Sequence, residues 1–279
     1  MNEKTIDTLV DDIYDLLNNG KSKPNQEYLF GMAASIMDSV RKQLWFSSTP
    51  RKSSLRMSNI GKPCVRSLWY EINSKAEAEP LSPQTRLKFM MGDIVEAVIL
   101  YLAKEAGHKV EDQQREIEIS GIKGHIDAII DGELVDVKSA SSYSMRKFKD
   151  GTLPNDDPFG YISQISGYAN ALNKSRGTFL AVDKSSGELA VYTHKDIEDT
   201  SDRIASVVSA MQDADAPPRA FGPVTDRQTG KQKLGVNCSY CPYKSDCWAE
   251  HNLDLKFRSG KPVFFVDVEE TQDENEHNF

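Results

Sequence analysis

The segment GHIDAIIDGELVDVKSA, residues 124–140, decides the fold that we expect for this chain. Asp131-Gly132 separates two β-like runs, and an Asp-Gly pair in that position is a strong signal for a two-residue hairpin turn. Such a turn pairs Ile130 with Glu133, so that the residue numbers of each opposed pair sum to 263. The sequence therefore predicts an antiparallel hairpin with a defined register.

This register places two carboxylates opposite each other, because Asp127 faces Asp136. Side chains alternate along a strand, so Lys138 lies on the same side as Asp136. That face carries His125, Asp127, Ile129, Leu134, Asp136 and Lys138, and the other face carries Ile126, Ala128, Ile130, Val135 and Val137. We expect the second face to be core and the first to carry the chemistry.

The opposed carboxylates predict a metal site, because like charges across a strand pair repel each other. A divalent cation removes this repulsion. Mg²⁺ favours one or two carboxylates, with water and substrate phosphate in its remaining positions. Lys138 could orient a water or stabilise charge that develops on a phosphate. The alternative is a solvent-facing strand that carries two acids and a lysine by chance.

The charges are unevenly distributed along the chain. The formal net charge is −8, from 34 Lys and Arg against 42 Asp and Glu. Residues 264–279 hold six acids and no Lys or Arg, whereas residues 39–70 hold seven basic residues and no acid. Trp45, Phe46, Trp69 and Tyr70 lie within the basic stretch. Cations interleaved with aromatic rings suit single-stranded nucleic acid, although a solvated loop with core aromatics explains the pattern equally well.

Length and hydropathy indicate a globular protein. With 279 residues and 39% hydrophobic content, the chain can bury a sizeable core. No apolar run approaches the eighteen or so residues that span a bilayer, and the acidic, helix-patterned N-terminus is unlike a signal peptide. We therefore expect no membrane partner and a cytoplasmic location, in the host cytoplasm if the chain is phage-encoded.

Hydrophobic periodicity predicts a mixed α/β core that follows a helical N-terminal arm. Helices are expected over residues 4–18, 26–46, 83–106, 159–173 and 195–213, and strands within 109–139, over 177–182 and over 188–193. The acidic end lacks the hydrophobic content to fold alone.

The four cysteines have the spacing of a shared metal site. Cys64 stands alone, and Cys238, Cys241 and Cys247 follow as C-x₂-C-x₅-C. Structural disulfides are not expected in a cytosolic protein, so metal ligation is the better interpretation. Four thiolates could hold zinc or an iron-sulfur cluster. Zinc ribbons normally show two close pairs, and unligated buried thiols remain a third alternative.

The hairpin resembles the core motif of the PD-(D/E)XK nuclease superfamily, in which an acid and a short hairpin precede acid-x-Lys. Asp127 matches the first acid, and Asp136-Val137-Lys138 matches the second element, with Asp in place of the commoner Glu. The resemblance implies that the Asp127 and Asp136 side chains and the backbone carbonyl of Val137 bind Mg²⁺ or Mn²⁺. It also implies that Lys138 is catalytic.

Two helical motifs are similar to those of the RecB-like exonuclease branch of this superfamily. Gln164 and Tyr168 fit its Q-x-x-x-Y motif, and four-residue spacing places both on one helix face. Gly92 to Glu96 fits a Gly-x-x-x-His/Glu pattern that supplies a metal ligand, which implies Glu96. Asp93 lies nearby as the alternative ligand.

The cysteines resemble those of the [4Fe-4S] nucleases of the same branch, which include AddB and the CRISPR-associated exonuclease. In that branch a cysteine, a basic residue and an aromatic stretch precede the core, as Cys64, Arg66 and Trp69-Tyr70 do here. The resemblance covers residues 60–250. It implies a cluster held by Cys64, Cys238, Cys241 and Cys247, which would close a very long loop.

Taken together, these observations predict an α/β fold with a PD-(D/E)XK restriction-endonuclease-like core, a mixed central sheet flanked by helices. We expect a helical N-terminal arm and basic linker over residues 1–60, the core with its C-terminal iron-sulfur segment over 61–260, and an acidic tail over 261–279. The tail is expected to be disordered, and it either recruits a protein partner or occludes the basic groove.

The resemblance implies a metal-dependent DNA exonuclease that acts on single strands or DNA ends in recombination, repair or phage DNA processing. Two other functions are possible from the sequence. One is a DNA-binding or recombination factor whose nuclease is weak or regulated by partners, and the other is a small-molecule metallohydrolase. The complete set of two acids and a lysine favours the enzyme over the first, and the basic aromatic segment disfavours the second.

Overall fold

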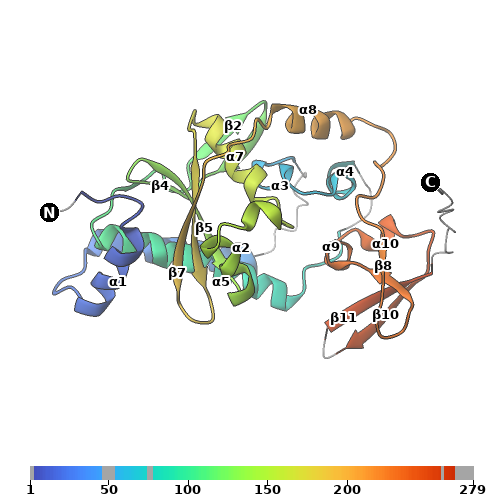
Figure 1. Cartoon of the computed structure of the whole chain (residues 1–279), viewed down its shortest axis with the longest axis horizontal. Coiled ribbons are helices and arrows are strands. Elements are labelled where there is room, and N and C mark those ends of the chain that lie inside the picture. Colours follow the sequence, from blue (N-terminus) through green and yellow to red (C-terminus); the bar gives the residue numbers. More distant parts are fainter. Residues whose placement is uncertain (1–2, 46–53, 74–77, 259–260, 268–279) are drawn as a thin grey trace, which may run out of the picture. The chain divides into compact units, whose positions relative to one another are not determined.

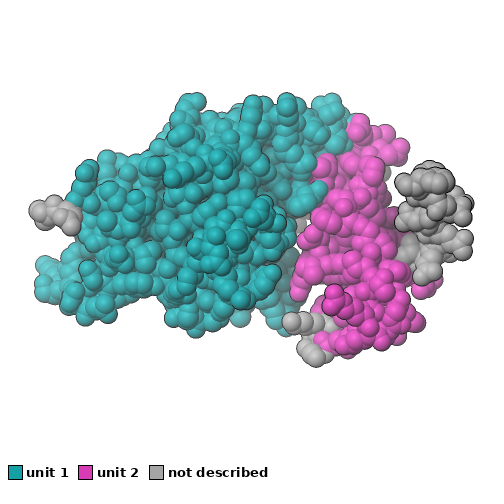
Figure 2. All heavy atoms as spheres, viewed as in Figure 1, with its two compact units in different colours: residues 1–63, 81–212 teal, residues 64–80, 213–279 magenta. Residues whose placement is uncertain are grey.

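The computed structural model describes residues 3–45, 54–73, 78–258 and 261–267 of the 279-residue chain. The chain divides into two compact units (Figure 2). Unit 1 comprises residues 1–63 and 81–212, and unit 2 comprises residues 64–80 and 213–279. This division differs from the expected one, because the N-terminal helices belong to the unit that contains the central sheet.

Unit 1 is built on the mixed sheet that the sequence predicts, with the strand order β1-β4-β5-β6-β7 (Figure 1). Its strands are β1 (Val110–Glu111), β4 (Ala128–Ile130), β5 (Glu133–Ala140), β6 (Gly177–Asp183) and β7 (Leu189–His194). β5 and β6 pair in parallel, and the other neighbours are antiparallel. The parallel pair requires a long crossover connection.

Helices flank this sheet. The helices of unit 1 are α1 (Leu9–Asn19), α2 (Gln26–Leu44), α3 (Met57–Ile60), α5 (Pro83–Glu105), α6 (Ser142–Lys149), the 3₁₀ turn η1 (Leu153–Asn155), α7 (Tyr161–Ala171) and α8 (Ser201–Ala210). A separate two-stranded sheet pairs β2 (Glu116–Ile119) with β3 (Ile122–His125). α6 and α7 form the crossover between the parallel strands. The sequence missed α3 and α6, both of which are short.

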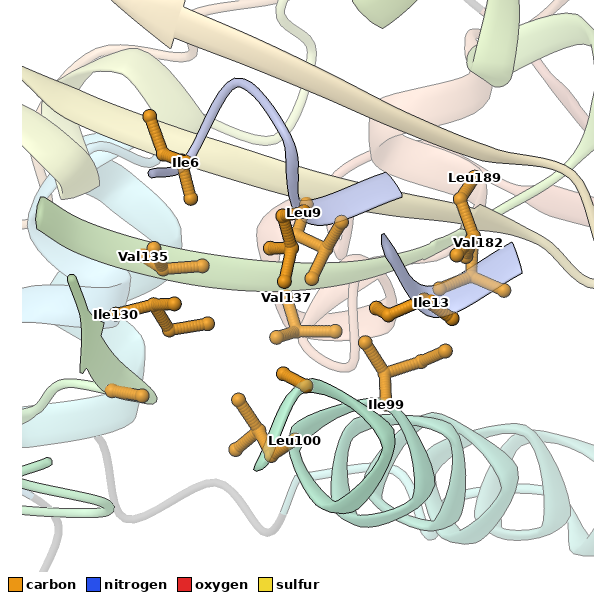
Figure 3. Packing of buried hydrophobic residues seen from close by; sticks show 13 residues of the cluster. Ile6, Leu9, Ile13, Ile99, Leu100, Ile130, Val135, Val137, Val182 and Leu189 are labelled. Atoms are coloured by element: carbon orange, nitrogen blue, oxygen red, sulfur yellow. The ribbon is translucent and has the colours of Figure 1, made fainter. Parts of the chain in front are cut away.

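One core cluster joins α1 and α5 to the sheet (Figure 3). α1 contributes Leu9 and Ile13, and α5 contributes Ile99 and Leu100, all of them buried. The predicted core face of the hairpin meets them through Ala128, Ile130, Val135 and Val137. α1 therefore belongs to the core of unit 1.

The hairpin has the predicted register and turn. Ile130 pairs with Glu133, and the next two pairs also sum to 263. Asp131 and Gly132 both have positive φ, 50° and 83°, as a type I′ turn requires. The pairing ends at Ala128, so the run that was predicted as one strand is divided into β3 and β4.

The other face of the hairpin differs in part from the prediction. Ile129 and Leu134 are buried, 8% and 0% exposed, so both faces are core near the turn. His125 belongs to β3, and its exposed side chain lies 3.9 Å from the Glu116 carboxylate. His125 is therefore not part of the chemical face.

Unit 2 contains a four-stranded sheet in the order β10-β11-β9-β8. Its elements are α4 (Val65–Asn73), β8 (Pro223–Thr225), β9 (Gln232–Leu234), α9 (Val236–Ser239), α10 (Lys244–Cys247), β10 (Leu253–Arg258) and β11 (Lys261–Val266). Leu234, Trp248 and Val266 form its buried centre. The expected tail is therefore shorter, because Lys261–Val266 pair with β10; residues 268–279 lie outside the described residues.

None of the helices in the described ranges is both long and apolar enough to cross a membrane.

Candidate active site

The predicted catalytic residues come from four segments of unit 1. Glu96 lies on α5, Asp127 directly precedes β4, Asp136, Val137 and Lys138 lie on β5, and Gln164 and Tyr168 lie on α7. The Asp127, Asp136, Glu96 and Lys138 side chains interact electrostatically with one another. The fold thus brings together residues that are up to 72 positions apart in the sequence.

Among these four side chains, the negative charge of Asp127 is strongly disfavoured by its surroundings. Its Oδ2 accepts a hydrogen bond from the backbone N–H of Val137, at 2.7 Å across the hairpin. Burial, followed by the charges of Asp136 and Glu96, raises the pKa of Asp127 well above its usual value. The predicted repulsion between Asp127 and Asp136 is present, and Glu96 adds to it.

Glu96 and Asp93, the two candidate ligands on α5, have different partners. Burial, followed by the charges of Asp136 and Asp93, raises the pKa of Glu96, although Gln114 Nε2 donates to Glu96 Oε1 at 2.7 Å. Asp93 instead accepts a 2.7 Å hydrogen bond from the buried hydroxyl of Ser39 on α2. Asp93 is therefore held in a contact between α2 and α5, and Glu96 is the better candidate ligand.

Lys138 is held as a cation between several partners. Its Nζ lies 2.6 Å from Oδ2 of the buried Asp136, 3.4 Å from Gln164 Oε1 and 4.6 Å from the centroid of the Tyr161 ring. Burial lowers the pKa of the Lys138 ammonium, but the charges of Asp136 and Asp127 outweigh burial, so the pKa rises. Lys138 can donate to an anion in this state, but it cannot act as a base.

Gln164 connects Lys138 to a buried tyrosine. Its Nε2 donates to the Tyr168 hydroxyl oxygen at 3.2 Å. Tyr168 is only 2% exposed, and burial raises the pKa of its hydroxyl to about 12. A Cβ at Gly124 would lie 2.8 Å from the Tyr168 ring, so this position requires glycine. The buried Tyr168 hydroxyl therefore fixes the orientation of the Gln164 amide. Of the two motif residues, Gln164 is the one that contacts Lys138.

Three contacts of the site could not be predicted from the local sequence. They are the Tyr161 ring beside Lys138, the Gln114 amide on Glu96 and the Ser39 hydroxyl on Asp93. None of these residues lies in the motif segments that identified the site. The spacing of Tyr161 three residues before Gln164 on the same helix is the one available signal.

The donor atoms of the site suit a hard cation. Carboxylate and carbonyl oxygens are the ligands that Mg²⁺ prefers, and three carboxylates, Glu96, Asp127 and Asp136, interact with one another here. A cation would also relieve the repulsion that raises the pKa of Asp127 and Glu96. The side chains are nevertheless not arranged as a finished site: across the described ranges, no three His, Cys, Asp or Glu residues are disposed to hold a metal ion.

All four cysteines lie in unit 2. Cys238 is on α9, Cys247 ends α10, and Cys64 directly precedes α4. Burial, followed by the charges of Cys64, Cys241 and Cys247, raises the pKa of the Cys238 thiol to about 11. The structure therefore groups the four thiols near one another, although in the same described ranges they do not form a ready metal-binding arrangement.

Part of the basic segment has other partners. Arg66 donates to the carbonyl oxygens of Ala216 and Pro217 at 3.1 and 2.7 Å, and Trp69 Nε1 donates to the Asp213 carbonyl at 3.0 Å. These contacts connect segments of unit 2. The Trp45 side chain is 80% exposed, whereas Phe46, Arg51 and Lys52 lie outside the described residues.

The raised pKa values of Asp127 and Glu96 predict how pH changes the stability of the metal-free protein. The folded chain binds these two protons more tightly than the unfolded chain, so their contribution to stability is full below about pH 4 and falls as pH rises through the raised values. Urea unfolding in chelator between about pH 4 and 8 measures this loss. Glu96→Gln should flatten the profile, and an unchanged slope in that variant would contradict the assignment.

The mixed sheet, the acid-bearing hairpin and the adjacent lysine together match the core motif of an acid, a short hairpin and acid-x-Lys. The sequence profile of the PD-(D/E)XK nuclease superfamily matches residues 35–248. The chain belongs to this superfamily. A search of curated proteins gave no match.

Several solved structures are similar to this chain at low sequence identity. SSO0001 is 15% identical with a TM-score of 0.43, over 77% of this chain and 95% of that one. An alkaline exonuclease (LHK-Exo) from Laribacter hongkongensis is 15% identical with a TM-score of 0.39, over 58% and 85%. A phage related exonuclease from Haemophilus somnus 129PT is 17% identical with a TM-score of 0.40, over 58% and 93%.

Proposed function

We propose that this chain is a metal-dependent DNA exonuclease that acts on single strands or DNA ends in recombination, repair or phage DNA processing. The observation that carries the proposal is the group of three carboxylates, Glu96, Asp127 and Asp136, beside the ammonium of Lys138. Membership of a nuclease superfamily supports it. The proposed location is the cytoplasm.

In this proposal the carboxylates of Glu96, Asp127 and Asp136 and the carbonyl of Val137 would hold Mg²⁺ or Mn²⁺. The ion, when bound, would polarise the phosphate and lower the pKa of a water that attacks it. Lys138 would donate to the phosphate oxygen that gains charge. Gln164, which accepts from Lys138 at 3.4 Å, would hold that ammonium in place, and Tyr168 would hold Gln164.

We also propose that Cys64, Cys238, Cys241 and Cys247 hold a [4Fe-4S] cluster, with zinc as the alternative. Support comes from the four thiols lying in one unit and from burial and the neighbouring thiols Cys64, Cys241 and Cys247, which together raise the pKa of Cys238. Thiolates are the ligands of both metals, and a bound cation would favour the charged thiolates. The acidic residues after Val266 remain candidates for contacting a protein partner or for competing with DNA.

End-labelled DNA tests the proposed activity. With Mg²⁺ or Mn²⁺ we expect linear single strands, and duplexes with free ends, to lose nucleotides progressively while closed circles persist. Lys138→Met should slow cleavage by roughly 100-fold or more, the scale of losing one donor to a developing oxyanion, and should leave DNA binding largely intact. Lys109→Met, which removes an exposed lysine paired with Glu111, is the matched control.

Two results would reject the exonuclease. Equal cleavage of closed circles would indicate an endonuclease. DNA binding without cleavage in either metal would favour the second candidate, a DNA-binding factor with weak or partner-regulated nuclease activity.

A further inference from the structure

Unit 1 contains a cavity of about 280 Å³ next to the candidate active site. Its lining includes Lys138, Ser141, Lys147, Phe159, Tyr161 and Lys184. The cavity lies at the carboxyl ends of the parallel strands β5 and β6, where α6 begins. Ligands of open α/β sheets commonly bind outside the carboxyl ends of the strands, and the volume is close to the lower end of the range for small-molecule sites, about 300 Å³.

An aromatic pair beside Lys138 lines this cavity. The Tyr161 ring lies 4.6 Å from Lys138 Nζ and stacks on Phe159, with ring centroids 5.4 Å apart and an interplanar angle of 30°. Phe159 is 62% exposed. Nucleobases stack on exposed aromatic side chains of this kind without regard to sequence.

The loop that carries Phe159 is anchored on both sides. Asp157 Oδ2 accepts from the backbone N–H of Ile162 at 2.8 Å, in the first turn of α7. Gly160 has a φ of 74°, and a Cβ there would lie 2.2 Å from the Gly61 carbonyl oxygen. The backbone approach of Gly160 to Gly61 therefore requires glycine and holds Phe159 in place.

Three lysines and two acids, Asp156 and Asp157, line the cavity, and Lys184 is the lysine without an acidic partner among the residues that the structure describes. Lys147 is 2.5 Å from the Asp156 carboxylate and also donates to the Asp156 carbonyl at 2.9 Å. Lys184 follows β6 with an exposed side chain, and it has no ion pair within the part of the chain that the structure describes. A lysine binds a phosphate as a point charge, so Lys184 suits one phosphate group.

We propose that this cavity binds one unpaired nucleotide of the substrate strand, adjacent to the scissile phosphate. Its base stacks on Phe159, and a phosphate faces Lys184. The inference rests on the proposed nuclease function and specifies it further, because a base inside a cavity of this size has left its pairing partner. The cavity thereby gives a physical basis for preferring single strands or frayed ends.

A fluorescent base tests this inference. Single-stranded DNA with 2-aminopurine at its terminal nucleotide is titrated with protein in Ca²⁺, which is expected to permit binding without cleavage. We expect stacking to quench the fluorescence in wild type. Phe159→Ala should lose most of the quenching and, in Mg²⁺, raise KM roughly tenfold with little change in kcat. Phe159→Trp should restore both. Phe257→Ala, at an exposed phenylalanine of unit 2, is the matched control.

A second arm tests the phosphate and the source of the nucleotide. Lys184→Gln should weaken binding of the strand and flatten its salt dependence, because fewer counterions are released. Free 2-aminopurine deoxyribonucleotide should compete only at much higher concentration than the strand does. Equal affinity of the free nucleotide would overturn the inference, since the cavity would then hold a released product and not the strand.

The outcomes separate this inference from the proposed function. Suppose that wild type cleaves normally and that Phe159→Ala retains both the quenching and the wild-type KM. The proposed nucleotide site in the cavity would then be wrong, and the proposed exonuclease activity would be unaffected. Wild type that does not cleave but shows quenching dependent on Phe159 would support the cavity and reject the exonuclease. Absence of both cleavage and quenching in wild type would reject both.

Discussion

Asp127→Asn is expected to abolish DNA cleavage and to make the metal-free protein more stable. The asparagine oxygen can still accept the hydrogen bond from the Val137 N–H, which is 2.7 Å long in wild type. The substitution removes the charge that burial, Asp136 and Glu96 disfavour. We expect a higher free energy of unfolding in chelator, because the buried charge is gone, together with a loss of cleavage of roughly 1000-fold or more.

Asp136→Asn is the matched comparison, because it removes the other hairpin carboxylate but has the opposite effect on metal-free stability. Asp136 is 2% exposed, and its Oδ2 lies 2.6 Å from Lys138 Nζ. Neutralising it leaves the lysine without its nearest counter-ion. Breaking a buried ion pair from one side typically costs about 3–5 kcal/mol. Cleavage should be lost in both variants.

Urea unfolding with chelator and with millimolar Mg²⁺ measures both effects. Metal that binds only the folded state stabilises wild type by mass action, and each variant should lose part of that gain. If Asp127→Asn were destabilised in chelator yet gained full stability from Mg²⁺, Asp127 would be a structural hydrogen-bonding residue. The proposed metal site would then have to be abandoned.

Cys64→Ser is expected to eliminate the metal of unit 2 and to destabilise that unit. Cys64 precedes α4, whereas its proposed co-ligands lie at residues 238–247 of the same unit. Metal binding in small domains contributes directly to folding, by about 10–16 kcal/mol for structural zinc. Anaerobically purified wild type should be brown with iron bound, and Cys64→Ser should be colourless, less soluble and more sensitive to protease.

Cys238→Ser should match Cys64→Ser, because both remove a ligand of the same proposed cluster. Ser239→Ala, on the same helix α9, removes one hydroxyl bonded to the Leu234 carbonyl and serves as the control that keeps its metal. If wild type were colourless and contained one zinc per chain, the four cysteines would bind zinc and not an iron-sulfur cluster. If Cys64→Ser unfolded at the same temperature as wild type, neither metal could have the proposed stabilising role.

The sequence alone was sufficient to determine the centre of the fold, because the deciding signals are local. An Asp-Gly turn sets φ at two adjacent residues, and the period of two then assigns Ala128 and Val135 to the core. The α7 motif likewise depends on the four-residue spacing of Gln164 and Tyr168. Short-range geometry of this kind is independent of the rest of the chain.

Only the tertiary structure determined which residues contact one another in the candidate site, because these contacts join segments that are distant in the sequence. The local pattern favoured Glu96 with Asp93 as the alternative, and only the packing of α2 against α5 engages Asp93 with Ser39. The burial that raises the pKa of Asp127 and the placement of Tyr161 against Lys138 likewise require the assembled sheet and the crossover. Burial and long-range charge are properties of the packed chain, so no single segment of the sequence encodes them.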